Sequence, residues 1–276
     1  LGGNAVNINV YCEFFPENNS IVILSNLTKL KEKIDLAREY GLRVFLSPYV
    51  YLKNGKPLAG QLNESNFREF LKQHTTLTLR LAQFANENQV ELYAVGNEVG
   101  LSLVNIPNST KYVNEWLQTI LGNVKKLYDG IVTTKEGVQL NLYLSYNFSG
   151  YDCLGFTFYP HTNATAVDPW SGIEYWGVNS LEEYESIVKK HIDNMSKLKK
   201  KFDIDCVILG EIGIDVVNGT YIGFDENSNK IRALAYEIVL KNGLGKVDGF
   251  FFSKFQYNEG GCEELDGILK EYFKHS

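Results

Sequence analysis

The sequence predicts an α/β barrel, in which parallel strands alternate with helices around a central core. The chain contains near-continuous apolar runs, which are typical of strands buried on both faces. Most of these runs are followed by a segment with helical periodicity. No stretch has the composition of a linker, which favours a single barrel domain over residues 1–276. The competing architecture, an open doubly wound sheet, is disfavoured because no strand is followed by a glycine-rich phosphate turn.

Seven strands are expected, so an eight-stranded TIM barrel would lack its first β/α unit. Only Asn147–Asp152 separates the fourth run from the fifth, which leaves no room for a crossover helix of normal length. Either that crossover is a loop or the strand count is off by one. A barrel without one strand exposes two edges, which predicts a separate segment that completes it. The expected strands are Val6–Tyr11, Arg43–Val50, Val90–Val95, Val138–Tyr146, Cys153–Tyr159, Cys206–Ile212 and Val247–Phe255.

The helices are predicted from apolar residues that recur on one face. In the first, Leu27, Leu30, Ile34 and Ala37 share a face, and Gly41 ends the helix. The others are expected within 67–84, 113–127, 181–201, 231–240 and 265–272. The stretch Asn163–Asn179 is too long to be a mere connector.

Composition excludes some classes of protein. The net charge is −6 and no basic patch follows a face, so nucleic acid is not an expected partner. No apolar stretch reaches transmembrane length, and the start at Leu1 without a leader suggests a mature or trimmed form. Eight Asn-X-Ser/Thr triplets suggest an extracellular or cell-surface glycoprotein, with an Asn-rich composition as the alternative explanation. They begin at Asn18, Asn26, Asn63, Asn108, Asn147, Asn163, Asn194 and Asn218.

The four cysteines form no Cys-X-X-Cys pair, which argues against a zinc site, and no metal or other cofactor is implied. Cys153 and Cys206 open what look like neighbouring strands and are candidates for a disulfide. Cys12 and Cys262 are candidates for a second one. Free buried thiols are the alternative for all four.

Two segments carry the strongest functional signal. Ala94–Gly100 and Val207–Gly213 are strand-like runs that end in Glu98 and Glu211, each bracketed by glycines. Carboxylates at the C-terminal ends of barrel strands lie where such barrels keep their chemistry. Cleavage of a glycosidic bond with retention needs two carboxyls, one acid and one nucleophile, roughly 5–5.5 Å apart. The sequence therefore predicts a sugar-cleaving enzyme.

These residues resemble the clan A glycoside hydrolases, which have Asn-Glu after the fourth strand and Glu after the seventh. Gly96-Asn97-Glu98 and Leu209-Gly210-Glu211 match those two motifs. The resemblance implies that Glu98 is the acid/base, that Glu211 is the nucleophile, and that Asn97 binds the sugar 2-hydroxyl. Asp152–Pro160 is similar to a strand of family 113 mannanases and family 53 galactanases, which implies that Tyr159 orients the nucleophile.

Other residues are candidates for binding the carbohydrate substrate. His161 follows the sixth strand of the clan pattern, Trp170 and Trp176 lie in the stretch after it, and Tyr49 and Tyr51 end the third. Many clan members have an arginine on strand two and a tryptophan after strand eight, and this chain has neither. Phe252 or Phe255 would replace the tryptophan, Lys254 would add a cation, and Glu13 would add a third carboxylate.

The leading hypothesis is a retaining hydrolase of β-linked mannan, galactan or glucan. A catalytically silent sugar-binding barrel is the alternative, and the intact pair Glu98 and Glu211 argues against it. A metal-dependent barrel hydrolase would need ligands at strand ends, and the four histidines form no ligand pattern.

Overall fold

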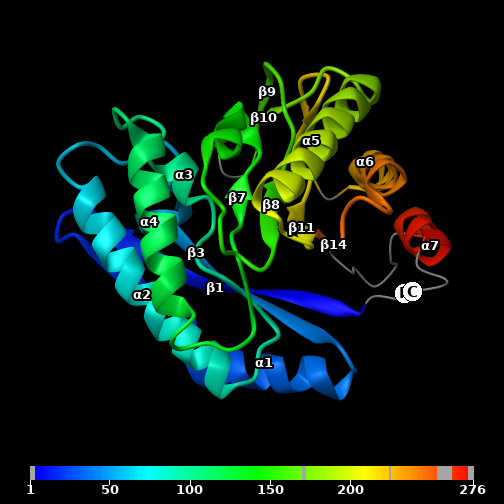
Figure 1. Ribbon diagram of the computed structural model, residues 1–276. Helices are drawn as coiled ribbons and strands as arrows, with labels where there is room; N and C mark the ends of the chain where they lie inside the picture. Colours follow the sequence, from blue (N-terminus) through cyan, green and yellow to red (C-terminus); the bar gives the residue numbers. More distant parts are fainter. Residues whose placement is uncertain (1–3, 170–171, 224, 254–262, 273–276) are drawn as a thin grey trace. The chain divides into compact units, whose positions relative to one another are not determined.

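The computed structural model describes residues 4–169, 172–223, 225–253 and 263–272. The chain divides into two compact units (Figure 1). The N-terminal unit comprises Asn4–Thr157 and Lys201–Cys206, and the C-terminal unit comprises Phe158–Lys200 and Val207–Ser276.

Parallel strands form the centre of the N-terminal unit. Its sheet runs in the order β1, β3, β5, β6, with Tyr11 opposite Tyr49 in the register of the first two strands. β7 continues the line of β6 after two residues and pairs in parallel with β8. The bounds are β1 Ala5–Phe15, β3 Arg43–Leu52, β5 Leu92–Ala94, β6 Ile131–Thr133, β7 Glu136–Gly137 and β8 Leu154–Phe158.

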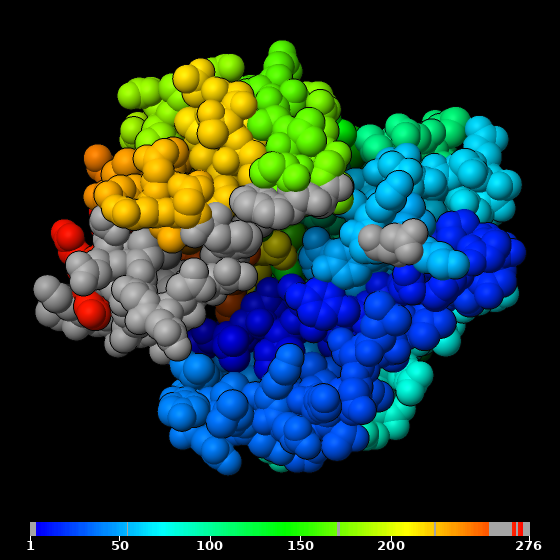
Figure 2. Space-filling view, turned by 180° about the vertical axis from the view of Figure 1, so that it is seen from behind, coloured from blue at the N-terminus to red at the C-terminus, as the bar shows by residue number. Residues whose placement is uncertain are grey.

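Two short strands are added antiparallel to this sheet. β2 (Ser20–Ile23) pairs with the end of β1, and β4 (Lys56–Pro57) pairs with the end of β3 after the 3-10 turn η1 (Lys53–Gly55). α1 (Leu27–Glu39) follows β2 and packs on β3. The outer surface made by β1, β2 and α1 is the blue region of Figure 2.

Local sequence explains where α1 begins and ends. The Asn26 Oδ1 atom accepts hydrogen bonds from the backbone N–H of Thr28 (2.9 Å) and Lys29 (3.1 Å), which caps two otherwise unpaired donors. Gly41 has a φ of 71°, a left-handed conformation that favours glycine. The predicted helix and its glycine stop are confirmed.

The remaining helices of this unit are α2 (Phe67–Glu87), the short α3 (Val99–Ser102) and α4 (Ser109–Val124). α2 and α4 pack side by side (Figure 1). The buried face of α4 carries the periodic residues Val113, Trp116, Leu117, Ile120 and Val124, as the spacing predicts.

The fourth predicted run, which is strand five in the clan's numbering, is wrong in position. Val138–Tyr146 was expected to be extended, but Gln139–Ser145 forms the 3-10 segment η2. The strand lies earlier, at β6 and β7, because that is where the ladders to β5 and β8 form. The crossover to β8 therefore contains η2, which resolves the apparently missing connection.

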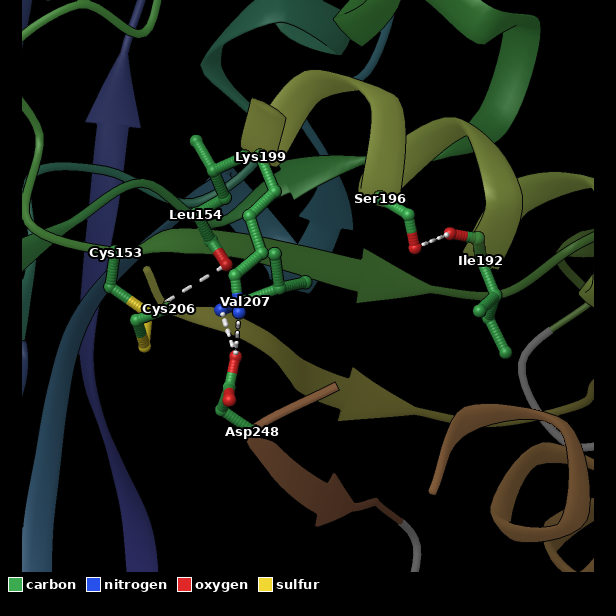
Figure 3. A network of polar contacts seen from close by, with 8 residues as sticks. All are labelled: Cys153, Leu154, Ile192, Ser196, Lys199, Cys206, Val207 and Asp248. Atoms are coloured by element: carbon green, nitrogen blue, oxygen red, sulfur yellow. Dashed lines mark hydrogen bonds and ion pairs between the residues drawn. A yellow bond between two sulfur atoms is a disulfide. The ribbon is translucent and has the colours of Figure 1, made fainter. Parts of the chain in front are cut away.

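A disulfide joins Cys153 and Cys206 within the N-terminal unit (Figure 3). This is the first of the two bridges that the sequence suggested. Cys12 is a buried free thiol, so the second suggested bridge is not formed. Cys262 lies outside the described residues.

The C-terminal unit contains the parallel pair β11 (Val207–Ile212) and β14 (Gly249–Phe252). At the start of this pair, Asp248 accepts hydrogen bonds from the Val207 N–H (2.8 Å) and from Lys199 (3.0 Å) (Figure 3). The helices are α5 (Leu181–Phe202), α6 (Glu226–Gly243) and α7 (Glu263–Tyr272), and α6 packs on α7.

Two antiparallel hairpins complete this unit. β9 (Ala164–Val167) pairs with β10 (Glu174–Gly177), and β12 (Val216–Val217) pairs with β13 (Thr220–Tyr221). The stretch Asn163–Asn179 is thus built around the first hairpin. With β6 and β7 counted together, the described parts of the two units supply five and two parallel strands, the number expected from the sequence.

Candidate active site

Glu98 follows the C-terminal end of β5 and comes directly before α3. Its backbone is left-handed (φ 52°, ψ 36°), a conformation that is uncommon outside glycine. The Glu98 N–H donates to the Lys135 carbonyl at 2.8 Å, and the Glu98 carbonyl accepts from the Ser102 N–H at 3.1 Å. These bonds hold the turn that presents the half-buried Glu98 side chain.

Groups on β7 and β8 surround the Glu98 carboxyl. Thr157 on β8 donates a hydrogen bond to Glu98 Oε1. Glu136 on β7 is buried, and its carboxylate accepts a hydrogen bond from the Gly100 N–H at 3.0 Å. Burial, and secondly the charge of Glu98, raise the pKa of Glu136 to about 7. The charge of Glu98 therefore disfavours the ionised form of Glu136.

Close packing of neighbouring side chains explains the glycines that bracket Glu98. A Cβ added at Gly100 would lie 2.0 Å from the Tyr146 hydroxyl oxygen. A Cβ added at Gly96 would lie 2.7 Å from Val99 and 3.2 Å from Trp116. The glycine-flanked motif seen in the sequence therefore lets neighbouring side chains close tightly around the turn.

Glu211 is the fifth residue of β11, at the C-terminal end of its strand. The Tyr159 hydroxyl donates to Glu211 Oε1 at 3.1 Å and also contacts Ser253 Oγ. Burial, followed by the charges of Glu211 and Asp215, raises the pKa of Tyr159 well above its ordinary value. Tyr159 therefore stays protonated and can keep donating to the carboxylate.

Gly213 is what allows this contact. A Cβ at Gly213 would lie 2.2 Å from the Tyr159 ring, so any larger residue would displace the tyrosine. The pairing of Tyr159 with Glu211 is the geometry that an orienting tyrosine requires. The role itself remains a prediction.

His161 and Trp176, two predicted sugar-binding residues, are brought together in the C-terminal unit. Their ring centroids are 5.8 Å apart, and Trp176 on β10 is 50% exposed. Burial lowers the pKa of His161, and its Nδ1 lies 3.2 Å from the Thr162 carbonyl oxygen. A neutral histidine beside an exposed indole is a suitable surface for stacking a sugar ring.

Phe252, one of two residues predicted to replace the clan's tryptophan, packs against a helix. Phe252 packs on Tyr236 of α6, with centroids 4.7 Å apart, and stacks with Phe250 on the same face. This contact favours helix packing over sugar binding for Phe252. Trp170, Lys254 and Phe255 lie outside the described residues.

Tyr49 and Glu13 lie near the ends of β3 and β1, in the N-terminal unit. The ring of Tyr49 contacts those of Tyr51 (4.5 Å) and Tyr11 (6.1 Å). Glu13 is half-buried and stands opposite Tyr51 in the parallel register. These positions suit a rim of aromatic and acidic groups, and their contact with substrate stays a prediction.

Sequence reasoning missed Lys135, Glu136 and Gln139, which lie in or beside β7. Lys135 is fully buried, and its ammonium donates to Asn9 Oδ1 at 3.3 Å. A partial signal was present, because Glu136 has a glycine beside it, although it is not bracketed by glycines as Glu98 and Glu211 are. It was overlooked because the strand was placed a few residues too late.

The described residues contain no group of three or more His, Cys, Asp or Glu side chains placed to hold a metal ion. They also contain no helix that is long and apolar enough to cross a membrane.

Comparisons with solved structures agree with the fold. A β-mannanase of Glycoside Hydrolase Family 113 from Alicyclobacillus acidocaldarius aligns with a TM-score of 0.72 at 12% identity, covering 100% of this chain and 88% of that one. A Bacteroides ovatus family 5 xyloglucanase aligns with a TM-score of 0.62 at 14% identity, covering 97% and 65%. The protein is a glycosidase with the TIM-barrel fold of clan A.

The family assignment is more specific. The sequence profile of Glycoside Hydrolase Family 113 matches residues 22–222, and the chain belongs to that family. A second β-1,4-mannanase of the family aligns with a TM-score of 0.69 at 15% identity, over 99% of this chain and 88% of that one. No curated protein matches the sequence.

Proposed function

We propose that the protein hydrolyses a β-linked mannan with retention of configuration, with Glu98 as acid/base and Glu211 as nucleophile. The observation that carries this proposal is that Glu98 follows the parallel strand β5, that Glu211 lies near the end of the parallel strand β11, and that each has its own polar partners. Glu98 lies near the high-pKa carboxyl of Glu136, and Glu211 accepts from a protonated Tyr159. The mannan preference rests on the family's β-mannanases, and galactan and glucan are the alternatives.

In the first step, the carboxylate of Glu211 attacks the anomeric carbon while Glu98 gives its proton to the glycosidic oxygen. The bond to the departing sugar breaks, and a glycosyl ester forms on Glu211. In the second step, Glu98 takes a proton from water, and the water oxygen displaces Glu211.

Asn97 has a suitable place for the sugar that stays on the enzyme. Its Oδ1 atom is buried and has no hydrogen-bond partner among the described residues. An unpaired buried acceptor is costly, and a hydroxyl of the bound sugar would satisfy it.

The first test is reducing-sugar release from β-mannan, β-1,4-galactan, β-glucan and xylan. We expect release from β-mannan by the wild type and by Glu64→Gln, an exposed control, and none from Glu211→Gln. No release from any glycan, with tight binding to one, would favour the catalytically silent sugar-binding barrel.

The two roles are separated with an activated aryl glycoside and azide. Azide should restore turnover to Glu98→Ala and give a glycosyl azide of retained configuration, because it intercepts the ester on Glu211. With Glu211→Ala, azide should give the inverted product. The opposite stereochemistry would reverse the assignments, and a single type of product from both variants would refute double displacement.

We also propose that the protein is an extracellular glycoprotein. The Cys153–Cys206 disulfide supports an oxidising compartment. Six of the eight Asn-X-Ser/Thr asparagines are exposed: Asn18, Asn26, Asn63, Asn108, Asn163 and Asn218. Protein produced through a eukaryotic secretory pathway should lose mass on treatment with an N-glycan-cleaving amidase, and an unchanged mass would contradict the proposal.

A separate segment that completes the barrel is a further proposal. Ala5–Val10 of β1 pair with β3 on one side, and no described strand of the N-terminal unit pairs with them on the other. Protection of the Ala5–Val10 amides from hydrogen exchange only when a longer form of the chain is used would support it. Equal protection in both forms would contradict it.

A further inference from the structure

Two buried acceptors without a partner lie around Glu98. Among the described residues, the buried side-chain atoms that lack a hydrogen bond include Asn97 Oδ1 and Gln139 Oε1. A buried acceptor without a hydrogen bond destabilises the folded state, so such atoms call for an explanation. The proposed function explains Asn97 Oδ1, because a sugar hydroxyl would donate to it. Gln139 Oε1 has no such explanation in that proposal.

Gln139 is placed beside the proposed acid by the glycine that precedes it on β7. A Cβ built on Gly137 would lie 2.3 Å from Gln139 Oε1 and 3.2 Å from Glu98 Oε1. The amide of Gln139 and the carboxyl of Glu98 therefore approach the same face of Gly137. A larger residue at position 137 would push one or both away.

The backbone that holds Gln139 is strained. Leu140 (φ 59°) and Asn141 (φ 55°) are consecutive left-handed residues that are not glycine. This conformation is unfavourable for a residue with a side chain, and such strain clusters at functional sites. The segment is anchored by the Val138 N–H, which donates to the Thr157 carbonyl at 3.2 Å, and Thr157 is also the donor to Glu98.

We propose that Gln139 Oε1 accepts a hydrogen bond from a hydroxyl of the departing sugar, and so forms part of a leaving-group subsite. This inference rests on the proposed function of Glu98. The acid must reach the glycosidic oxygen, which belongs to the departing sugar after cleavage, so groups packed beside the acid's carboxyl lie near that sugar. Asn97 is assigned to the sugar that remains on the enzyme, so Gln139 is assigned to the departing sugar. Sugar hydroxyls are donors, and an amide oxygen is an acceptor.

The test compares two substrates with the same retained sugars. One is an oligosaccharide of the glycan that the wild type hydrolyses, and the other carries an aryl leaving group without hydroxyls. Gln139→Met keeps the length of the side chain and removes the acceptor. We expect kcat/KM to fall about 10- to 100-fold on the oligosaccharide and less than about 2-fold on the aryl glycoside.

Asn141→Gly is the matched control in the same loop. It keeps the left-handed backbone and removes an exposed side chain, so kcat/KM should be unchanged on both substrates. Equal losses for Gln139→Met on both substrates, or no loss on either, would overturn the proposal. A wild type that cleaves no glycan would instead refute the proposed function.

A second measurement does not require a variant to fold. Oligosaccharides that lack single hydroxyls on the departing sugar are tested with the wild type. Removal of one particular hydroxyl should lower kcat/KM by about the same factor as Gln139→Met. Testing that deoxy substrate with the variant should give no further loss, because both changes remove the same hydrogen bond. Tolerance of every deoxy position would refute the hydrogen bond.

Discussion

Replacement of Glu136 with Gln should make the protein more stable at alkaline pH. Glu136 is buried near Glu98 and accepts a hydrogen bond from the Gly100 N–H at 3.0 Å. Its pKa is raised from the ordinary 4.5 to about 7, first by loss of solvent and then by the charge of Glu98. Glutamine has nearly the same shape, stays neutral at every pH, and retains an oxygen that can accept from Gly100.

The magnitude follows from the linkage between protonation and folding. A carboxyl whose pKa is raised in the folded state favours folding fully below its unfolded pKa, near 4.5. That contribution is lost as the pH rises through about 7. Each pKa unit corresponds to about 1.4 kcal/mol, so ionising Glu136 in the folded protein costs about 3 kcal/mol. The variant does not bear this cost.

The assay is urea unfolding of the wild type and Glu136→Gln at pH 4 and pH 8. The difference in the free energy of unfolding, variant minus wild type, should rise by about 3 kcal/mol between the two pH values. Glu64→Gln, an exposed control, should give no such change. Equal differences at both pH values would show that Glu136 ionises normally and would refute the reasoning.

Two other predictions concern the disulfide and the nucleophile's partner. Cys153→Ala with Cys206→Ala should lower the free energy of urea unfolding by about 4 kcal/mol, since the bridge closes a loop with a sequence separation of 53; a loss below about 1 kcal/mol would contradict this. Gly213→Ala should lower kcat by at least as much as Tyr159→Phe, because its methyl group displaces the ring that donates to Glu211. Steady-state kinetics on an aryl glycoside test this, and wild-type kcat in Gly213→Ala would show that the contact is not needed.

Local features of the fold could be predicted because the residues that cause them are adjacent in sequence. The cap at Asn26, the apolar face of α1 and the stop at Gly41 all lie within one helix. The two glycine-flanked glutamates are equally local, since a strand and the turn that follows it form one continuous segment.

The fifth strand shows where this reasoning fails. Leu140, Leu142 and Leu144 alternate as in a strand, yet Leu140 is 59% exposed and the buried residue of η2 is Tyr143. Pairing with β5 and β8 fixed the strand at β6 and β7, and this depends on segments distant in sequence.

The sequence by itself determined the alternation of strands and helices, the cap and the glycine stop of α1, and the two glutamates that follow or end parallel strands. Only the tertiary structure decided that Glu136 and Gln139 surround Glu98, whereas the family resemblance had already implied that Tyr159 lies beside Glu211. The physical reason is distance along the chain. Periodicity, capping and turn preference act over a few residues, whereas burial, orphaned acceptors and pKa shifts arise only when strands far apart in sequence are brought together.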